Sequence, residues 1–131
     1  MPDFPPDPND WLRRLSPDDW IRAALGELGR ARQAHERGAD RAALAGCKRA
    51  AGMALNGALI LEPNPAWGRT YLEHLAALAY DARTPRAVRE ASGAVLRART
   101  ASPLILDKAH DVIAHAWFVV HRQINGANAA S

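Results

Sequence analysis

Polar side chains that could do chemistry recur along the last apolar stretch of the chain, at Asp107, Asp111, His115 and Arg122. Asp111 and His115 are four residues apart, so on a helix they would meet on one face. A carboxylate beside an imidazole raises the imidazolium fraction and orients the ring. This stripe could therefore serve acid–base catalysis or phosphate binding, although an ordinary solvated face has the same pattern. Phe118 favours a face covered by another element or subunit, because a solvated face would carry a polar residue there.

Arg69, Glu73 and His74 form a second candidate group. The spacing of Arg69 and Glu73 is that of a helical ion pair, and His74 fits the edge of a buried face. The chain has no serine-nucleophile motif, P-loop or dinucleotide glycine pattern, and no Cys/His set with zinc-ligand spacing. We therefore expect no metal and no cofactor. The single cysteine, Cys47, lies in an apolar stretch and is interpreted as a buried structural thiol.

The element most able to organise such residues is the stretch 40–61, DRAALAGCKRAAGMALNGALIL. It is apolar nearly all round, which is typical of a buried helix, and its recurring glycines and alanines let other helices approach closely. Lys48 and Arg49 near its middle argue against a membrane span. The polar side chains of these two residues and of Asn56 must therefore face solvent, a dimer interface or a pocket. The candidate binding residues are therefore Lys48, Arg49, Asn56, Trp67 and Phe118.

Helix start and stop signals divide the rest of the chain. Ser16, Thr84 and Ser102 each precede a proline, and such a pair of residues caps and opens a helix. Asp40 is the expected cap of the helix at 40–61, and Gly126 is the expected stop signal of the last helix. The predicted helices span residues 17–37, 40–61, 66–81, 85–99 and 103–125.

These helices predict an all-α fold, because no stretch shows the alternating pattern of a half-buried strand. Short loops join the helices, so neighbours should be antiparallel. We expect an up-and-down antiparallel bundle of four to five helices, with the helices at 40–61 and 103–125 at its centre. The predicted organisation is a proline-rich arm at 1–15, a single bundle domain at 16–126 and a frayed tail at 127–131.

The net charge of +3 in 131 residues is mild, and the arginines alternate with Asp and Glu along several helices. That pattern is typical of a solvated surface, so nucleic acid is a possible partner that the charge pattern does not support. No predicted helix has the Lys/Arg-rich polar face opposite Trp and Phe that binds a membrane surface. The first ten residues have neither the basic patch nor the apolar run of a signal peptide, so we expect a cytoplasmic protein.

Three largely apolar helical stretches are CKRAAGMALNGALIL at 47–61, GRTYLEHLAAL at 68–78 and AHDVIAHAWFVVHRQ at 109–123. Together they resemble the HEPN superfamily of small helical bundles. The resemblance implies a HEPN-like bundle, often dimeric, that acts as an RNase or as the companion of a nucleotidyltransferase. RNase members carry Arg-x4-6-His at the start of the final helix, and that signature is absent here. The pairs Arg30–His35 and Arg69–His74 have the spacing but lie on other helices.

The resemblance and the candidate residues together favour a non-catalytic HEPN-like module. It would form a homodimer and bind a partner protein, such as a nucleotidyltransferase, or a nucleotide. Two alternatives stay open: an RNase or other nucleic-acid enzyme of the HEPN type, and an unrelated small-ligand-binding or structural bundle. The enzyme would use Arg69 and His74, or else Asp111, His115 and Arg122.

Overall fold

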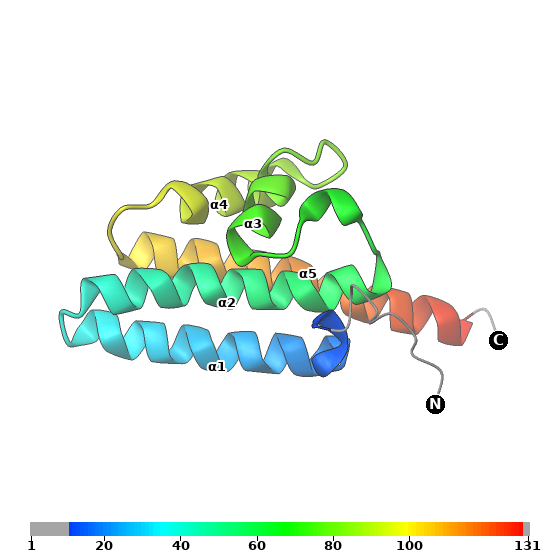
Figure 1. Cartoon of the computed structure of the whole chain (residues 1–131), viewed down its shortest axis with the longest axis horizontal. Helices are drawn as coiled ribbons and strands as arrows, with labels where there is room; N and C mark the ends of the chain where they lie inside the picture. Colours follow the sequence, from blue (N-terminus) through cyan, green and yellow to red (C-terminus); the bar gives the residue numbers. More distant parts are fainter. Residues whose placement is uncertain (1–10, 130–131) are drawn as a thin grey trace, which may run out of the picture.

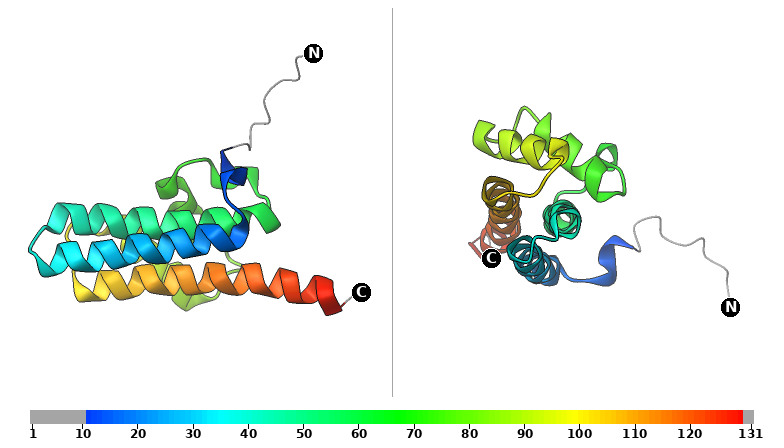
Figure 2. Two further views of the ribbon diagram at one scale, coloured as in Figure 1. Left: turned by 90° about the horizontal axis from the view of Figure 1, so that it is seen from below. Right: turned by 90° about the vertical axis from the view of Figure 1, so that its left-hand side faces the viewer.

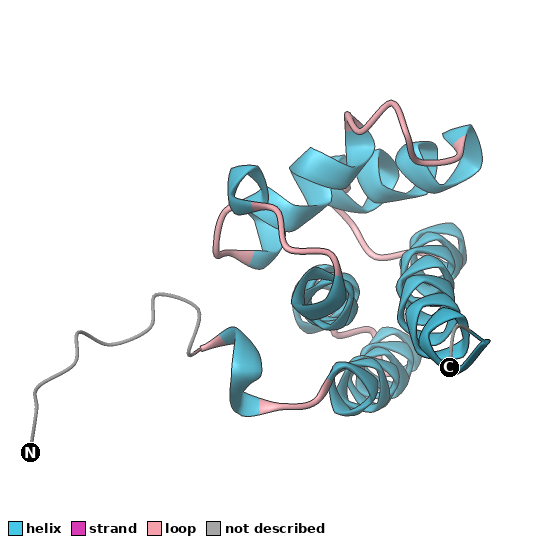
Figure 3. Cartoon of the chain, turned by 90° about the vertical axis from the view of Figure 1, so that its right-hand side faces the viewer, coloured by secondary structure: helices cyan, strands magenta, loops and turns pink. Residues whose placement is uncertain are grey.

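The computed structural model describes residues 11–129, and the side chains of residues 11–122. Every regular element in this range is helical, as Figure 3 shows, so the expected all-α class is confirmed. The predicted arm is described only from residue 11, and the last two residues of the predicted tail lie outside the described range. The elements are the 3-10 helices η1 (Leu12–Arg14) and η2 (Pro65–Trp67) and the α-helices α1 (Pro17–Glu36), α2 (Asp40–Leu61), α3 (Tyr71–Ala79), α4 (Arg86–Arg97) and α5 (Pro103–Ala129).

α2 is the central helix of the bundle. α1 lies on one side of it and α3 and α4 lie on the other, while α5 runs alongside it (Figure 1). Viewed from the end of the bundle, α2 is flanked by α1, α5 and the α3–α4 pair (Figure 2). α1 and α4 run opposite to α2, and α5 runs in the same direction as α2. The up-and-down order therefore holds for α1, α2, α4 and α5, with the short α3 inserted between α2 and α4.

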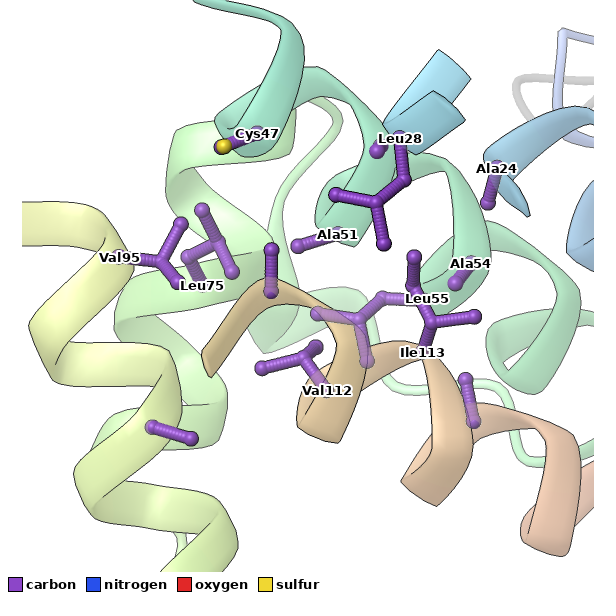
Figure 4. Packing of buried hydrophobic residues seen from close by; sticks show 14 of the residues in the cluster. Ala24, Leu28, Cys47, Ala51, Ala54, Leu55, Leu75, Val95, Val112 and Ile113 are labelled. Carbon is purple, nitrogen blue, oxygen red and sulfur yellow. The ribbon is translucent and has the colours of Figure 1, made fainter. Parts of the chain in front are cut away.

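One hydrophobic core joins all five α-helices, and each of them contributes at least one large apolar side chain. In chain order from α1 to α5, those drawn in Figure 4 include Leu28, Leu55, Leu75, Val95 and Ile113. Each such side chain contributes about 1.5–3 kcal/mol by leaving water. Cys47 also lies in this core, which confirms its interpretation as a buried thiol.

Glycines of α2 allow the neighbouring helices to approach closely. A Cβ atom added to Gly57 would lie 2.7 Å from the carbonyl oxygen of Pro17 in α1. One added to Gly52 would lie 2.6 Å from Cγ of Tyr71 at the start of α3. Non-bonded carbon atoms pack at about 3.5–4.0 Å, so alanine does not fit at Gly52 without displacing its neighbour. The small residues of α2 thus determine how near α1 and α3 can lie.

Two of the four predicted helix caps form. The Oγ of Ser16 accepts a hydrogen bond from the backbone N–H of Asp19 at 3.1 Å. The Oγ of Ser102 accepts one from the backbone N–H of Ile105 at the same distance, 3.1 Å. Each bond satisfies a donor that the first turn of a helix would otherwise leave unpaired.

The predicted caps at Asp40 and Thr84 are wrong. Ala39 takes the N-cap position of α2, so Asp40 is already the first helical residue. Pro85 takes the N-cap position of α4, and Thr84 is buried, with its backbone N–H bonded to the carbonyl oxygen of Asp81 at 3.0 Å. A backbone contact with the preceding loop thus keeps Thr84 outside the helix.

The predicted bounds of α3 and α5 are also wrong. Gly68 interrupts the predicted helix at 66–81 with a φ of 73°, a conformation that glycine adopts without a steric penalty. α3 begins only after Thr70, whose Oγ1 accepts a hydrogen bond from the backbone N–H of Glu73 at 3.1 Å. α5 continues through Gly126, the expected stop, and ends at Ala129. A glycine ends a helix only where the backbone turns left-handed, and a helix can otherwise pass through it.

Candidate functional site

A groove of about 1040 Å³ lies between α5, the C-terminal half of α2 and the start of α4. The connections before and after α3 complete its wall. Part of the lining is apolar and comes from Leu55, Leu59, Val88 and Val119. The charged and aromatic residues that line it are Glu62, Trp67, Asp81, Arg83, Asp111, His115, Phe118 and Arg122.

α5 places four of the sequence-predicted residues in this groove. Asp111, His115, Phe118 and Arg122 follow each other at intervals of four, three and four residues, which keeps them on one helix face. The other face of α5 is held in the core, so the orientation of this face is determined by packing. Asp107 is separate from the groove, because its carboxylate lies 3.7 Å from Arg32 of α1.

The charged groups of the groove are unevenly paired. Arg122 donates a hydrogen bond to Glu62 at 2.9 Å, and Nε of Arg83 lies 3.4 Å from Oδ1 of Asp81. Asp111 forms no ion pair with any residue that the structure describes. It lies eleven residues from Arg122, which is about 16 Å along the helix axis. The groove therefore has a free carboxylate toward one end and a guanidinium toward the other.

His115 lies between these two ends and is half-buried. Burial lowers the pKa of its imidazole and the charge of Arg122 lowers it further, whereas Glu62 and Asp81 raise it. The ring is therefore mainly neutral near pH 7. The expectation that Asp111 would favour the imidazolium form is wrong, because burial and Arg122 outweigh the carboxylates. No hydrogen bond joins the described side chains of Asp111 and His115.

His74 and Asn56 lie in a buried network between α2 and α3, away from the groove. His74 is 0 % exposed and Asn56 is 1 % exposed. Nε2 of His74 lies 2.8 Å from Oδ1 of Asn56, and Nδ1 lies 2.9 Å from the carbonyl oxygen of Trp67. Burial lowers the pKa of His74, while the Trp67 carbonyl and the charge of Glu73 raise it. Because no surface of this ring is open to a substrate, its contacts hold α3 against α2.

Arg69 lies over the ring of Trp11, with its guanidinium carbon 5.6 Å from the ring centroid. Trp11 in turn stacks on His74, with ring centroids 6.1 Å apart. The predicted helical pair of Arg69 with Glu73 does not form among the described side chains, because α3 begins only at Tyr71. Arg69 and His74 thus both contact the indole ring of Trp11, and His74 itself is fully buried, so they do not form a common active site.

Lys48 and Arg49 bind neighbouring helices and do not line the groove. Nζ of Lys48 donates a hydrogen bond to the carbonyl oxygen of Leu96 in α4 at 3.0 Å. Nε of Arg49 donates one to Glu27 of α1 at 2.6 Å, and Arg30 binds the same carboxylate. The bonds from Arg30 and Arg49 lower the pKa of Glu27. The polar residues of α2 therefore contact three different neighbours and do not form one site.

Sequence reasoning missed three charged residues of the groove, Glu62, Asp81 and Arg83. They lie in the connections between helices, where no periodicity marks which way a side chain points. The only signal available is that each is a charged residue close to a predicted helix end. Their position in the groove follows from the packing of α2, α4 and α5.

Comparison of the chain with protein-family models, with curated proteins and with solved structures finds no match. Among the described residues, no three His, Cys, Asp or Glu side chains are grouped so that they could hold a metal ion. Between residues 11 and 129, no helix is both long and apolar enough to cross a membrane. A function for this chain therefore has to be argued from the groove and its chemistry.

Proposed function

We propose that the chain is a non-catalytic, HEPN-like module that binds a nucleotide in the groove. The observation that carries the proposal is the face of α5. It aligns a free carboxylate, a neutral imidazole, an exposed phenyl ring and a guanidinium, which belong to Asp111, His115, Phe118 and Arg122. A nucleotide offers groups that match these in order: a base edge with N–H donors, a planar ring and phosphates.

Asp111 and His115 suit the edge of a base. A carboxylate accepts hydrogen bonds, and a neutral imidazole both donates and accepts one. Within the described part of the chain, neither side chain is already hydrogen-bonded. Phe118, which is 67 % exposed, and Trp67 line the same groove and offer ring faces for stacking. Stacking of a base on an aromatic side chain contributes about 1–3 kcal/mol.

Arg122 and Arg83 suit the phosphates. Both guanidiniums are exposed and are held by ion pairs with Glu62 and Asp81. Exposed ion pairs contribute only about 0–1 kcal/mol, so a phosphate can replace the carboxylate partner. Because Asp111 lies about 16 Å from Arg122 along α5, its negative charge repels a phosphate at Arg122 only weakly.

The HEPN-like part of the proposal includes a homodimer. Trp117 and Phe118 are exposed neighbours on α5, with ring centroids 5.9 Å apart in an edge-to-face arrangement. A second copy that covers Trp117 would remove apolar surface from water beside the groove. Light scattering at micromolar protein should give the mass of a dimer, and a strict monomer would refute this part. A protein partner of the nucleotidyltransferase type fits the same proposal, because such an enzyme acts on nucleotides.

Isothermal titration calorimetry with nucleoside monophosphates and triphosphates tests the proposal. We expect one site per chain, and binding at least about tenfold weaker in Arg122→Gln and in Asp111→Asn. Each variant removes a charge-assisted hydrogen bond. Asp111→Asn keeps the shape of the side chain, and Arg122→Gln keeps a polar side chain without the charge. Arg22→Gln is the control, because Arg22 is an exposed arginine of α1 that pairs with Asp18 at 2.9 Å. Absence of binding, or equal weakening in the control, would refute the proposal.

His115 supports one alternative, an RNase or other nucleic-acid enzyme. A neutral imidazole can accept a proton near pH 7, and Arg122 could stabilise negative charge on a phosphate. In that case wild-type protein would cleave mixed RNA, and His115→Ala would not. The binding proposal instead predicts equal background cleavage by both proteins. A co-purified ligand without nucleotide character, found by native mass spectrometry, would favour an unrelated small-ligand-binding bundle.

A further inference from the structure

A second pocket, of about 340 Å³, lies between η1 and the start of α3. It shares no lining residue with the groove. Trp11 and Arg14 line it from η1 and its N-cap, Asn56 from α2, Arg69 from the connection before α3, and Tyr71 from the first turn of α3. The pocket is therefore a separate feature, built where three segments that are distant in the sequence meet.

Two of the residues that line this pocket carry a buried N–H group without an acceptor. Nδ2 of Asn56 is buried and forms no hydrogen bond in the described structure, although Oδ1 of the same amide lies against His74. Nε1 of Trp11 is likewise buried and forms no hydrogen bond to a described group. A buried donor without an acceptor is unfavourable, because it has lost water and gained no partner. The pocket thus offers donors to a group that brings acceptor atoms.

The charge of the pocket has one sign. Arg14 and Arg69 line it, and neither forms an ion pair with a carboxylate in the described range. No Asp or Glu is among its lining residues. The neighbouring Glu73 does not line the pocket, and Thr70 and the backbone of Arg69 lower the pKa of its carboxyl. A small anion with several oxygen atoms is the group that would satisfy both the guanidiniums and the unpaired N–H donors.

The hydrogen bond between Asn56 and His74 links this pocket to the protonation state of His74. Both ring nitrogens of His74 lie against oxygen atoms, which belong to Asn56 and Trp67. Carbonyl oxygens only accept, so a ring that donates to both is an imidazolium. A neutral ring instead needs the Asn56 amide turned by 180°, with Nδ2 donating to His74. An anion in the pocket that accepts from Nδ2 would hold Oδ1 toward His74 and favour the protonated ring.

We infer that this pocket binds a small tetrahedral oxyanion of the sulfate or phosphate type, and that binding is linked to proton uptake at His74. Arg14, Arg69, Trp11 and Asn56 supply donors from four separate side chains, which suits an anion with four oxygens better than a carboxylate. The charged groups around His74 act in opposite directions. Glu73 on its own helix favours the imidazolium, and the guanidiniums of the pocket oppose it until the anion neutralises them. By linkage, the anion binds more tightly as the pH falls.

Calorimetric titration with sodium sulfate at constant ionic strength tests the inference, because sulfate keeps its charge between pH 5 and pH 8. We expect one site per chain, tighter binding at pH 5.5 than at pH 7.5, and a heat that depends on the ionisation enthalpy of the buffer. Arg69→Gln should weaken binding about tenfold, because it removes a charge-assisted bond. Trp11→Phe should also weaken it, because it removes the indole N–H and keeps an aromatic ring.

Two arginine variants serve as controls. Arg41→Gln removes an exposed guanidinium at the start of α2, fifteen residues and about 22 Å along the helix from Asn56. Arg22→Gln removes an exposed guanidinium of α1 that pairs with Asp18 at 2.9 Å and lines neither pocket. Both should bind sulfate as wild type does. The site is refuted if sulfate does not bind, or if either control weakens binding as much as Arg69→Gln. Binding that is equal at both pH values overturns the linkage to His74, and none of these results bears on the groove.

Discussion

Replacement of Gly52 by alanine should destabilise the bundle, because α3 lies directly against this position of α2. The added Cβ would lie 2.6 Å from Cγ of Tyr71, about 1 Å closer than carbon atoms normally pack. Tyr71 is the first residue of α3, so relief of the contact requires a shift of that helix. Overpacking of this kind costs about 1–3 kcal/mol, and the better helix propensity of alanine returns up to about 1 kcal/mol. We expect a net loss of about 1–2 kcal/mol in the free energy of unfolding.

Gly29→Ala is the matched control for this variant. Gly29 lies in the interior of α1, and no heavy atom lies within 4 Å of a Cβ built there. Alanine at this position should raise the free energy of unfolding by up to about 1 kcal/mol. Urea unfolding followed by far-UV circular dichroism measures both variants. If Gly52→Ala were as stable as wild type, or if both variants changed in the same direction, the close approach of α2 and α3 would be refuted.

Three further predictions concern single side chains. The free energy of unfolding should fall between pH 7 and pH 5 in sulfate-free buffer, since burial lowers the pKa of His74 below its ordinary value of 6.5 and the unfolded chain then binds the extra proton. Urea titrations should show a smaller fall in His74→Gln, and an equal fall would contradict this reasoning. Cys47 should react with a disulfide reagent only as fast as the chain unfolds, because it is fully buried and burial raises the pKa of its thiol. Rapid labelling in native buffer would show instead that the core opens there. Ser16→Ala should cost about 1 kcal/mol in urea unfolding by removing the cap of α1, and an unchanged midpoint would show that the cap contributes nothing.

Local signals predicted most of the fold, and competing contacts explain where they failed. The bounds of α2 and the caps at Ser16 and Ser102 depend on residues within one or two turns, which sequence spacing describes well. Thr84 has the right residue type and position for a cap, but its backbone N–H bonds to the carbonyl oxygen of Asp81 in the preceding loop, and the helix begins only after Pro85. The start of α3 could have been predicted, because Thr70 and Glu73 have the spacing of a capping box.

The candidate site was predictable only along α5. Helix geometry places Asp111, His115 and Arg122 on one face whatever the rest of the chain does. Glu62 lies sixty residues before Arg122 and meets it only because α2 and α5 pack in parallel. The protonation state of His115 is a second example. The spacing of Asp111 and His115 predicted a raised imidazolium fraction, whereas burial and the charge of Arg122 lower the pKa of the ring. Properties that depend on what surrounds a helix face therefore require the packed structure.

The claim that the groove binds a nucleotide along α5 is tested most directly by backbone amide NMR spectra recorded while a nucleoside triphosphate is titrated. The prediction is that amide shifts concentrate between Asp111 and Arg122, in the 81–85 connection and at the indole N–H of Trp67. The amides around Gly29 in α1, away from the groove, should not move. Spectra that stay unchanged at millimolar nucleotide, or shifts as large around Gly29 as along α5, would contradict the proposal.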